Sequence, residues 1–240
     1  ENGYSGSLMP GSTTLRSLLE RYATHHACHL KSRKQTLSLV NLMIERLGHL
    51  PVNSINNPCL AHYRDARLSI VSSQTVRKEI DIVRRVIKLA REEWGLDSPF
   101  GVPTVRMPKQ PRGRERRVSS FELEKLNAHL SPVMRLAVQI ALDTAMRRGE
   151  IARIDAADLI QPDYGLVVPE TKNGRRRVVP LTRSVYERLY EHLQRSDGKV
   201  GIRPDSITQA FQRACAKASI GNLRFHDLRH EAISRMFEKG

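Results

Sequence analysis

Cysteine, aromatic residues and long apolar runs are all scarce in this sequence. It holds 3 cysteines in 240 residues, at scattered positions, so we expect a reducing compartment and no disulfide framework. No apolar run reaches the roughly 18 residues of a membrane-spanning helix, and aromatic residues make up only 5% of the chain. This composition argues against a membrane span and against an aromatic interfacial anchor. Residues 1–12 are polar and rich in glycine and serine, which predicts a disordered tail rather than a signal peptide.

Acidic residues are also in short supply, at 25 against 40 lysines and arginines. The resulting net charge of +15 at pH 7 says little about the fold but much about partners. It favours binding to a polyanion, for which nucleic acid is the first candidate and an anionic membrane surface the rival. With 40% hydrophobic residues the chain is expected to be globular, to bind DNA and to have no membrane partner.

The first third of the chain has the apolar periodicity of helices. The segments with this pattern are 13–26, 32–48, 56–69 and 72–94. In the last of them one apolar stripe runs at i, i+4, i+7, i+11, i+14 and i+18, and the basic residues lie off it. The stripe consists of Val76, Ile80, Val83, Ile87, Ala90 and Trp94. Residues 13–98 are therefore predicted to form a helical DNA-binding domain, a bundle of about four helices with a basic exterior.

The start of the segment 72–94 has two interpretations. Ser73, Gln74 and Thr75 precede Arg77 and Lys78. Hydroxyl groups at a helix N-terminus can serve only to cap the helix. Combined with cations they also suit contacts with DNA phosphates or a groove, and we favour this second interpretation.

Residues 99–117 combine prolines and glycines with a dense basic run that ends at Arg117. This composition predicts an interdomain linker. The linker could be a solvated tether, but basic residues on both flanks favour a strap that follows a phosphate backbone. Its candidates for DNA contacts are Arg112, Arg114 and Arg116.

Residues 118–240 are predicted to form a second domain, with helices and a small antiparallel sheet. Ser119 and Glu122 have the spacing of a capping box that opens a helix. The apolar stretch from about Pro132 to Met146 predicts a central helix with Arg147 at its end. The runs GLVVPE and RRRVVPL, joined by TKNG, predict a β-hairpin with Lys172 at its tip. Further helices are expected at 183–195, 205–218 and 225–240.

Four polar residues, remote in sequence, stand at element ends in this domain: Arg147, Lys172, His226 and Arg229. Two guanidinium groups can grip the non-bridging oxygens of a phosphodiester and stabilise the charge of a pentacoordinate phosphorane. An ammonium group can protonate a departing oxygen, and an imidazole can move a proton at neutral pH. Each residue taken alone is a common surface feature, so the interpretation depends on the order and context of the motifs.

The motifs TAMRRGEI, PETKNGRRRVVPL and FHDLRHEAISRMFEKG, in this order, resemble the three catalytic boxes of the tyrosine recombinases, or phage integrase family. The resemblance covers roughly residues 13–240, because the helical first domain is similar to the family's core-binding domain. Within the family the boxes are most similar to those of shufflon-type invertases and related integrases of bacterial mobile elements. The implied fold class is mainly α: an N-terminal four-helix core-binding bundle, then an α+β tyrosine-recombinase catalytic domain with a small antiparallel sheet.

The resemblance also implies roles for individual residues. Ala145 stands where the family more often has glycine, and Arg148 is expected to contact the DNA backbone. Asp227 and His230 lie inside the last box and are expected to support it. The residues that match catalytic positions are Arg147, Lys172, His226 and Arg229, with Glu150 supporting the arginines.

The family's nucleophile, a tyrosine after the H-x-x-R box, has no match here. The last tyrosine is Tyr190, and none follows Arg229. The nucleophile is therefore expected to lie beyond the 240 residues, which makes the catalytic domain C-terminally incomplete and this chain inactive by itself. A tyrosine donated by another subunit and a degenerate, non-cleaving relative are the alternatives.

The implied activity is site-specific DNA recombination. Strands are cleaved and rejoined by transesterification through a 3′-phosphotyrosyl intermediate, with no metal or nucleotide cofactor. The implied partner is a double-stranded DNA recombination site, with a homotetramer on two sites and a dimer on each. A bacterial cytoplasmic location, on the nucleoid when DNA is bound, follows from the same resemblance. A catalytically inactive DNA-binding relative and a type IB topoisomerase-like enzyme are the alternative functions.

Overall fold

A computed structural model describes residues 11–97, 100–169 and 176–239 of the chain. The chain divides into two compact units, Glu1–Arg112 and Gly113–Gly240, and the division falls inside the segment predicted as a linker. Most of the predicted tail lies outside the described residues. Within the described ranges, no helix has the length and apolar content needed to cross a membrane.

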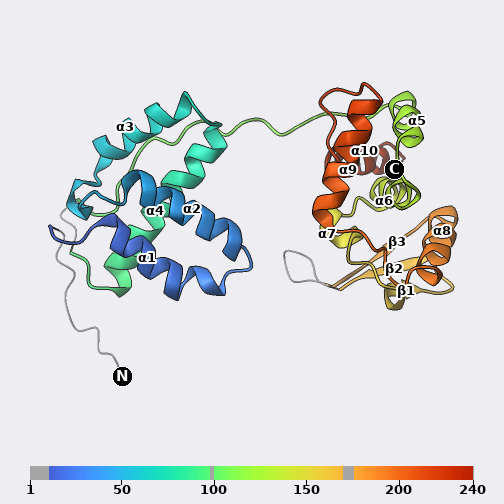
Figure 1. Cartoon of the computed structure of the whole chain (residues 1–240), viewed down its shortest axis with the longest axis horizontal. Coiled ribbons are helices and arrows are strands. Elements are labelled where there is room, and N and C mark those ends of the chain that lie inside the picture. The colour runs from blue at the N-terminus through green and yellow to red at the C-terminus, as the bar shows by residue number, and fades with distance from the viewer. Residues whose placement is uncertain (1–10, 98–99, 170–175, 240) are drawn as a thin grey trace. The chain divides into compact units, whose positions relative to one another are not determined.

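The first unit is a bundle of helices, drawn in blue to green in Figure 1. Its helices are α1 (Leu15–His25), α2 (Arg33–Leu47), α3 (Asn57–Leu68) and α4 (Ser73–Glu93), with 3-10 turns η1 (Ala27–His29) and η2 (Val52–Ser54). The four helices expected from the sequence are all present. The predicted stripe of α4 is buried, from Val76 with no exposure to Trp94 at 9% just after the helix.

Short polar side chains open these helices at the expected places. The side chain of Asn56 accepts a hydrogen bond from the backbone N–H of Cys59 at 3.0 Å, ahead of α3. Ser72 does the same for Thr75 at 3.3 Å, ahead of α4. Each bond satisfies a donor that the first helical turn leaves without a partner. The cap of α4 is therefore Ser72, whose hydroxyl is also hydrogen-bonded to that of Thr75 at 2.9 Å.

A buried ion pair lies inside this bundle, between α3 and α4. Arg67 donates from Nη2 to Oε1 of Glu79 at 2.7 Å and from Nε to Oε2 at 3.0 Å. The hydroxyl of Tyr63 donates to the same carboxylate at 2.8 Å. Glu79 is fully buried, so these hydrogen bonds keep a desolvated charge satisfied. Burial and the carboxylate of Glu79 raise the pKa of Tyr63, which remains a donor.

The first half of the linker is docked on its own unit. Nη1 of Arg77 donates to the carbonyl oxygen of Pro108 at 2.8 Å, and Nε of Arg84 donates to that of Pro103 at 2.9 Å. Arg64 holds the carbonyl of Arg106 in the same way, at 2.8 Å. Val102, Val105 and Met107 pack against the core of the bundle. Guanidinium groups thus replace the sheet or helix partners that this proline-rich backbone lacks.

The second unit combines helices with a small sheet (Figure 1). Its elements are α5 (Ser120–Ala128), α6 (Pro132–Thr144), α7 (Arg148–Ile151), η3 (Ala156–Asp158), β1 (Leu159–Ile160), β2 (Gly165–Val168), β3 (Arg177–Pro180), α8 (Arg183–Gln194), α9 (Pro204–Lys217) and α10 (Asp227–Lys239). The predicted capping box of α5 is confirmed, since Ser119 and Glu122 exchange both hydrogen bonds. The core surrounds α6, which packs against α8, α9 and α10.

The sheet is antiparallel with strand order β1-β2-β3. The predicted hairpin strands are β2 and β3, whose register pairs Val168 with Arg177 and Leu166 with Val179. The predicted turn between them lies outside the described residues. The short strand β1 was not predicted, because two residues after a 3-10 turn carry no period of their own.

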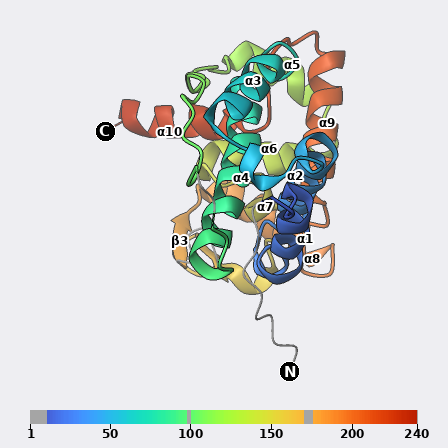
Figure 2. The ribbon, with the colours of Figure 1, turned by 90° about the vertical axis from the view of Figure 1, so that its left-hand side faces the viewer.

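The last helix, α10, is buried near its N-terminus and exposed to solvent near its C-terminus. Its first half packs on α6, whereas Figure 2 shows its C-terminal end projecting from the second unit. The side chain of Phe237 near that end is 84% exposed. The H-x-x-R box therefore lies on the part of the helix that the core holds in place.

Candidate active site

The turn between α6 and α7 differs from the prediction that the buried helix extends to Met146. The helix ends at Thr144, because Ala145 adopts a left-handed conformation with φ 54° and ψ 24°. The hydroxyl of Thr144 accepts a hydrogen bond from the N–H of Met146 at 3.2 Å, which stabilises the reversal. Arg147 follows with extended backbone and caps the short helix α7. The prediction that Arg147 ends the buried helix is thus wrong, and a tight turn after the helix holds this residue instead.

Glu150 is the centre of an ion-pair cluster. Its side chain is 4% exposed and accepts from Nη1 of Arg147 at 3.1 Å. The backbone N–H of Arg147 donates to the other carboxylate oxygen at 2.9 Å. Burial raises the pKa of Glu150, but hydrogen bonds from Arg177 and Arg147 outweigh that effect, and the pKa lies below its ordinary value. The carboxylate therefore stays ionised and fixes both ends of Arg147.

Arg177 is a member of this cluster that the sequence analysis did not assign. Its Nη2 lies 2.8 Å from Oε2 of Glu150, and its Nη1 lies 3.4 Å from Oε1. Side chains alternate along a strand, so Arg177 shares a face of β3 with Val179, which packs on the core. Val178, on the other face, is 57% exposed. The run RRRVVPL does not alternate between polar and apolar residues, so the sequence carries no clear signal for which arginine faces inward.

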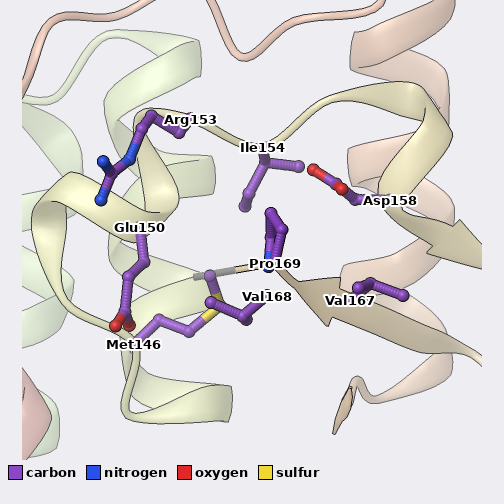
Figure 3. Close-up of a pocket in the computed structure, with 8 residues that line it drawn as sticks. All are labelled: Met146, Glu150, Arg153, Ile154, Asp158, Val167, Val168 and Pro169. Atoms are coloured by element: carbon purple, nitrogen blue, oxygen red, sulfur yellow. The ribbon is translucent and has the colours of Figure 1, made fainter. Parts of the chain in front are cut away.

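A small pocket adjoins Glu150 between α7 and β2. Figure 3 shows Met146 beside Glu150 and Val168, with Pro169, the residue after β2, close by and Val167 farther along the strand. Arg153, Ile154 and Asp158 complete the lining. The side chain of Glu150 is only 4% exposed, so its carboxylate is largely removed from water. Desolvation of this kind strengthens the bonds from the two arginines.

Arg229 approaches the same turn from α10. Its guanidinium donates to the carbonyl oxygen of Ala145, 84 residues earlier in the chain. Burial lowers the pKa of Arg229, and the positive charges of Arg147 and Arg177 lower it further, while Glu150 acts in the opposite direction. Arginine remains charged despite such effects. Three guanidinium groups of like charge are thus held together, with one buried carboxylate to offset them.

His226 immediately precedes α10 and completes the group. Desolvation lowers its pKa, and His230, Arg229 and Arg147 lower it further, with Asp227 opposing them. The rings of His226 and His230 lie 5.1 Å apart in an edge-to-face arrangement. The prediction placed His226 on the last helix, but the helix begins one residue later, at Asp227. A neutral imidazole at neutral pH can accept a proton, or donate one through its N–H group.

The structure therefore brings together Arg147, Glu150, His226 and Arg229, and adds Arg177. Lys172 lies outside the described residues. Three adjacent cations with a neutral imidazole are suited to an anionic, tetrahedral or trigonal bipyramidal group such as a phosphodiester. Among the described residues, no group of three or more His, Cys, Asp or Glu side chains is arranged to hold a metal ion.

Comparison with known families agrees with this geometry. Residues 116–240 match the model of the phage integrase family, and residues 12–102 match that of the phage integrase N-terminal domain. The chain belongs to the phage integrase family, the tyrosine recombinases. Its recognition from three short motifs is confirmed, and so is the mainly α fold class.

Curated members of the family include a shufflon-specific DNA recombinase of Escherichia coli. It is 33% identical over 242 residues, which is 95% of this chain and 62% of that protein. The tyrosine recombinase XerA of Saccharolobus solfataricus is 26% identical and matches 70% of this chain and 56% of its own length. The chain thus spans about three-fifths of the length of these relatives.

Solved structures of the family share the fold. A lambda integrase (75–356) dimer bound to a COC′ core site has a TM-score of 0.78 at 19% identity, over 94% of this chain and 90% of that one. A lambda integrase tetramer bound to a Holliday junction has a TM-score of 0.79 at 19% identity, over 95% of this chain and 74% of that one.

The residues of this chain that were predicted to contact DNA differ in exposure and in their partners within the protein. At the start of α4, Gln74 and Lys78 are exposed, Ser73 and Thr75 are half-buried, and Arg77 is bonded to the linker. In the linker, Arg112 is exposed, whereas Arg114 and Arg116 are paired with Asp227 and Glu122. Arg148 lies 3.5 Å from Asp205 and is 46% exposed. The carboxylates already bound to Arg114 and Arg116 distinguish these two residues from Arg112.

Proposed function

We propose that this chain is the DNA-binding and DNA-cleaving part of a site-specific recombinase. Arg147 and Arg229 bind the non-bridging oxygens of one scissile phosphate, and Glu150 holds Arg147 in position. The observation that carries the proposal is the meeting of residues 147 and 229, remote in sequence, beside one buried carboxylate. Like charges are costly to bring together, so such a cluster indicates an anionic ligand.

The reaction is a transesterification in which bond energy is retained. A tyrosine oxygen attacks phosphorus, the bond to the 5′ oxygen breaks, and a 3′-phosphotyrosyl link and a free 5′-hydroxyl form. The 5′-hydroxyl of another strand then reverses the step. Two guanidinium groups neutralise the additional negative charge of the phosphorane. No tyrosine follows Arg229 in the 240 residues, and we do not assign the attacking tyrosine to any of them.

Lys172 is proposed as the general acid, and His226 as a proton carrier beside the phosphate. A lysine ammonium can protonate the 5′ oxygen as it leaves. A bridging sulfur at the 5′ position needs no such proton, since a thiolate is a good leaving group. Lys172→Ala is therefore expected to slow cleavage of a normal linkage and to have little effect on a bridging 5′-phosphorothiolate.

The proposed partner is a double-stranded recombination site, bound by two protomers, with four protomers on two sites. Support comes from the net charge of +15 and from the lambda integrase dimer on a core site and tetramer on a Holliday junction. Arg112 and Arg148 at the surface, together with the N-terminal turn of α4, are proposed to contact the DNA backbone. The protein would act on DNA in the bacterial cytoplasm.

The direct test is formation of a covalent adduct by the natural protein that contains these 240 residues. Duplexes with random sequence on both sides of one bridging 5′-phosphorothiolate would be incubated with it, and protein–DNA adducts recovered under denaturing conditions would reveal the site. Arg147→Ala and Arg229→Ala are each expected to lower the cleavage rate by about 100-fold or more. Arg213→Ala, on the exposed face of α9, serves as the matched control and should cleave at the normal rate.

The outcomes separate the rival functions. Sequence-specific binding without any adduct indicates an inactive DNA-binding relative. Relaxation of supercoiled plasmid by one protomer, without pairing of two sites, indicates a topoisomerase. Undiminished adduct from both arginine variants refutes the proposed site.

A further inference from the structure

The second half of the linker, residues 113–117, is bound to α10 by two arginines. Arg114 grips Asp227 as a fork, from Nε to Oδ1 at 3.0 Å and from Nη2 to Oδ2 at 2.8 Å. It also bonds Asn222, through Nη1 to the side-chain oxygen at 3.0 Å and through Nη2 to the carbonyl at 2.8 Å. Nε, Nη1 and Nη2 of this guanidinium therefore all donate hydrogen bonds to Asn222 or Asp227.

Arg117 repeats the arrangement one helical turn further on. Its Nε lies 2.7 Å from Oε2 of Glu231, and its Nη1 lies 2.7 Å from Oε1 of Glu238. The backbone N–H of Val118 donates to Glu231 as well, at 3.3 Å. Hydrogen bonds from Arg117 and Arg235 outweigh burial and lower the pKa of Glu231 to about 2.

Of the two buried carboxylates at the start of α10, Asp227 is paired with Arg114 of the linker, whereas Glu231 is shared between Arg117 of the linker and Arg235 of the same helix. Asp227 is 1% exposed and Glu231 is 3% exposed, so neither can be satisfied by bulk water. They are four residues apart and so occupy one face of the helix. A buried carboxylate without a cation is strongly destabilising. The linker therefore determines which face of α10 turns toward it.

Arg229 lies midway between these two acids in sequence. Two residues correspond to about 200° around a helix, which places Arg229 on the side opposite Asp227 and Glu231. From that side its guanidinium reaches the carbonyl of Ala145. The helix is thus held from one side by the linker and presents its arginine on the other.

We infer that Arg114 and Arg117 are positioning residues for Arg229 and His226, rather than contacts with the DNA backbone. This inference rests on the proposed function and assigns the linker a task within it. Removing Arg114 leaves the buried carboxylate of Asp227 without its guanidinium, so that the first turn of α10 shifts and Arg229 loses its alignment with Arg147; removing Arg117 has a smaller effect, because Glu231 keeps Arg235. A 1 Å displacement of this kind is enough to lower a cleavage rate about 100-fold.

The test compares Arg114 with Arg112, two residues earlier. Arg112 is exposed and makes no ion pair or hydrogen bond within the described part of the chain. In the natural protein, Arg114→Gln should lower the single-turnover cleavage rate at saturating DNA by about tenfold or more and leave the salt dependence of DNA binding unchanged. Arg112→Gln should instead weaken binding and reduce the slope against log salt by about 1.

A lysine variant sharpens the distinction. Arg114→Lys keeps the charge but cannot make the two-pronged contact with Asp227, so it should remain slow. A phosphate contact would tolerate this change. Normal cleavage by Arg114→Lys, together with a reduced salt slope in Arg114→Gln, would overturn the inference.

Two further measurements keep the result decisive. If Arg114→Gln does not fold, the double variant Arg114→Gln with Asp227→Asn removes both charges. The folded double variant should still cleave slowly, and a normal rate would refute positioning.

Hydrogen exchange on the 240-residue chain needs no catalysis. Residues 227–235 should lose protection in Arg114→Gln while α8 does not, and this holds even if the wild type forms no adduct. Unchanged protection in α10 would count against positioning.

Discussion

Arg177 and Glu150, 27 residues apart, are joined by an ion pair in which Nη2 lies 2.8 Å from Oε2. This pair links the sheet to the turn that holds Arg147. Glu150 thus binds one arginine from its own turn and one from β3. The inner face of β3 therefore completes the support of Arg147.

The first prediction concerns this pair. Arg177→Ala leaves Glu150 with Arg147 as its main partner, so Arg147 is drawn toward the carboxylate and away from the phosphate. The single-turnover cleavage rate of the natural protein should fall by about 10- to 100-fold. Arg176→Ala changes an exposed neighbour one position earlier and serves as the control. Equal rates for the two variants would show that Arg177 has no part in the site.

The second prediction concerns the protonation of His226. Its pKa should lie below the ordinary value of 6.5, because desolvation and neighbouring cations disfavour the imidazolium. Arg229→Gln removes one of those cations and should raise the pKa of His226, as followed by NMR titration of the ring. Arg213 is not among the charges that act on His226, so Arg213→Gln should leave the pKa of His226 unchanged. A pKa that does not respond to Arg229→Gln would mean that the two side chains are not neighbours.

Because the pKa of His226 is lowered in the folded protein, it also affects how the stability of the fold depends on pH. The folded state binds a proton at His226 less readily than the unfolded chain does, so the unfolded state holds more protons near pH 6. Stability therefore falls as the pH drops through 6.5 and below. His226→Gln should weaken that decline, as measured by urea unfolding at pH 7 and pH 5.5.

The third prediction concerns Ala145 and its left-handed backbone. A side chain in this conformation costs about 1 kcal/mol relative to glycine, so Ala145→Gly should stabilise the second unit by up to about 1 kcal/mol. Ala141→Gly is the matched control, since Ala141 lies inside α6 and is buried. There the same change should destabilise by about 1 kcal/mol or more. Thermal unfolding of both variants tests the contrast in sign, and a loss of stability in Ala145→Gly would contradict the account of the turn.

The fourth prediction concerns the buried pair Arg67–Glu79 in the first unit. Arg67→Ala leaves a fully buried carboxylate without its cation and should destabilise this unit by about 3–5 kcal/mol. Combining Arg67→Met with Glu79→Leu removes both charges and keeps the volume, so the loss should be much smaller. Urea unfolding of single and double variants measures the coupling. Additive losses would show that the two side chains do not depend on each other.

The elements of this fold were largely predictable from sequence because their signals are local. The stripe of α4 and the capping box of Ser119 and Glu122 each lie within one helix, and the structure contains both. The end of α6 was misplaced by two residues, because a left-handed alanine carries no compositional signal. Glycine at position 145 would have marked the turn.

The motifs pointed to Arg147, Arg229 and the supporting Glu150, but not to Arg177 or to the partners of the linker arginines. Arg147 and Arg229 stand in motifs that can be identified by order and spacing. Arg177 pairs with Glu150 across the sheet, and Arg114 pairs with Asp227 across 113 residues. A basic linker looks alike in sequence whether its arginines meet phosphates or buried carboxylates. Only the tertiary fold distinguishes Arg112 from Arg114.

The central claim is that guanidinium groups 147 and 229 neutralise one scissile phosphate. It is tested most directly by removing the charge from that phosphate alone, with a methylphosphonate at the cleaved linkage of the site recovered above. Arg229→Ala should lose about 100-fold or more in cleavage rate on the normal phosphate, and much less on the neutral methylphosphonate, because the missing cation then has less charge to offset. An equal loss on both linkages would contradict the account.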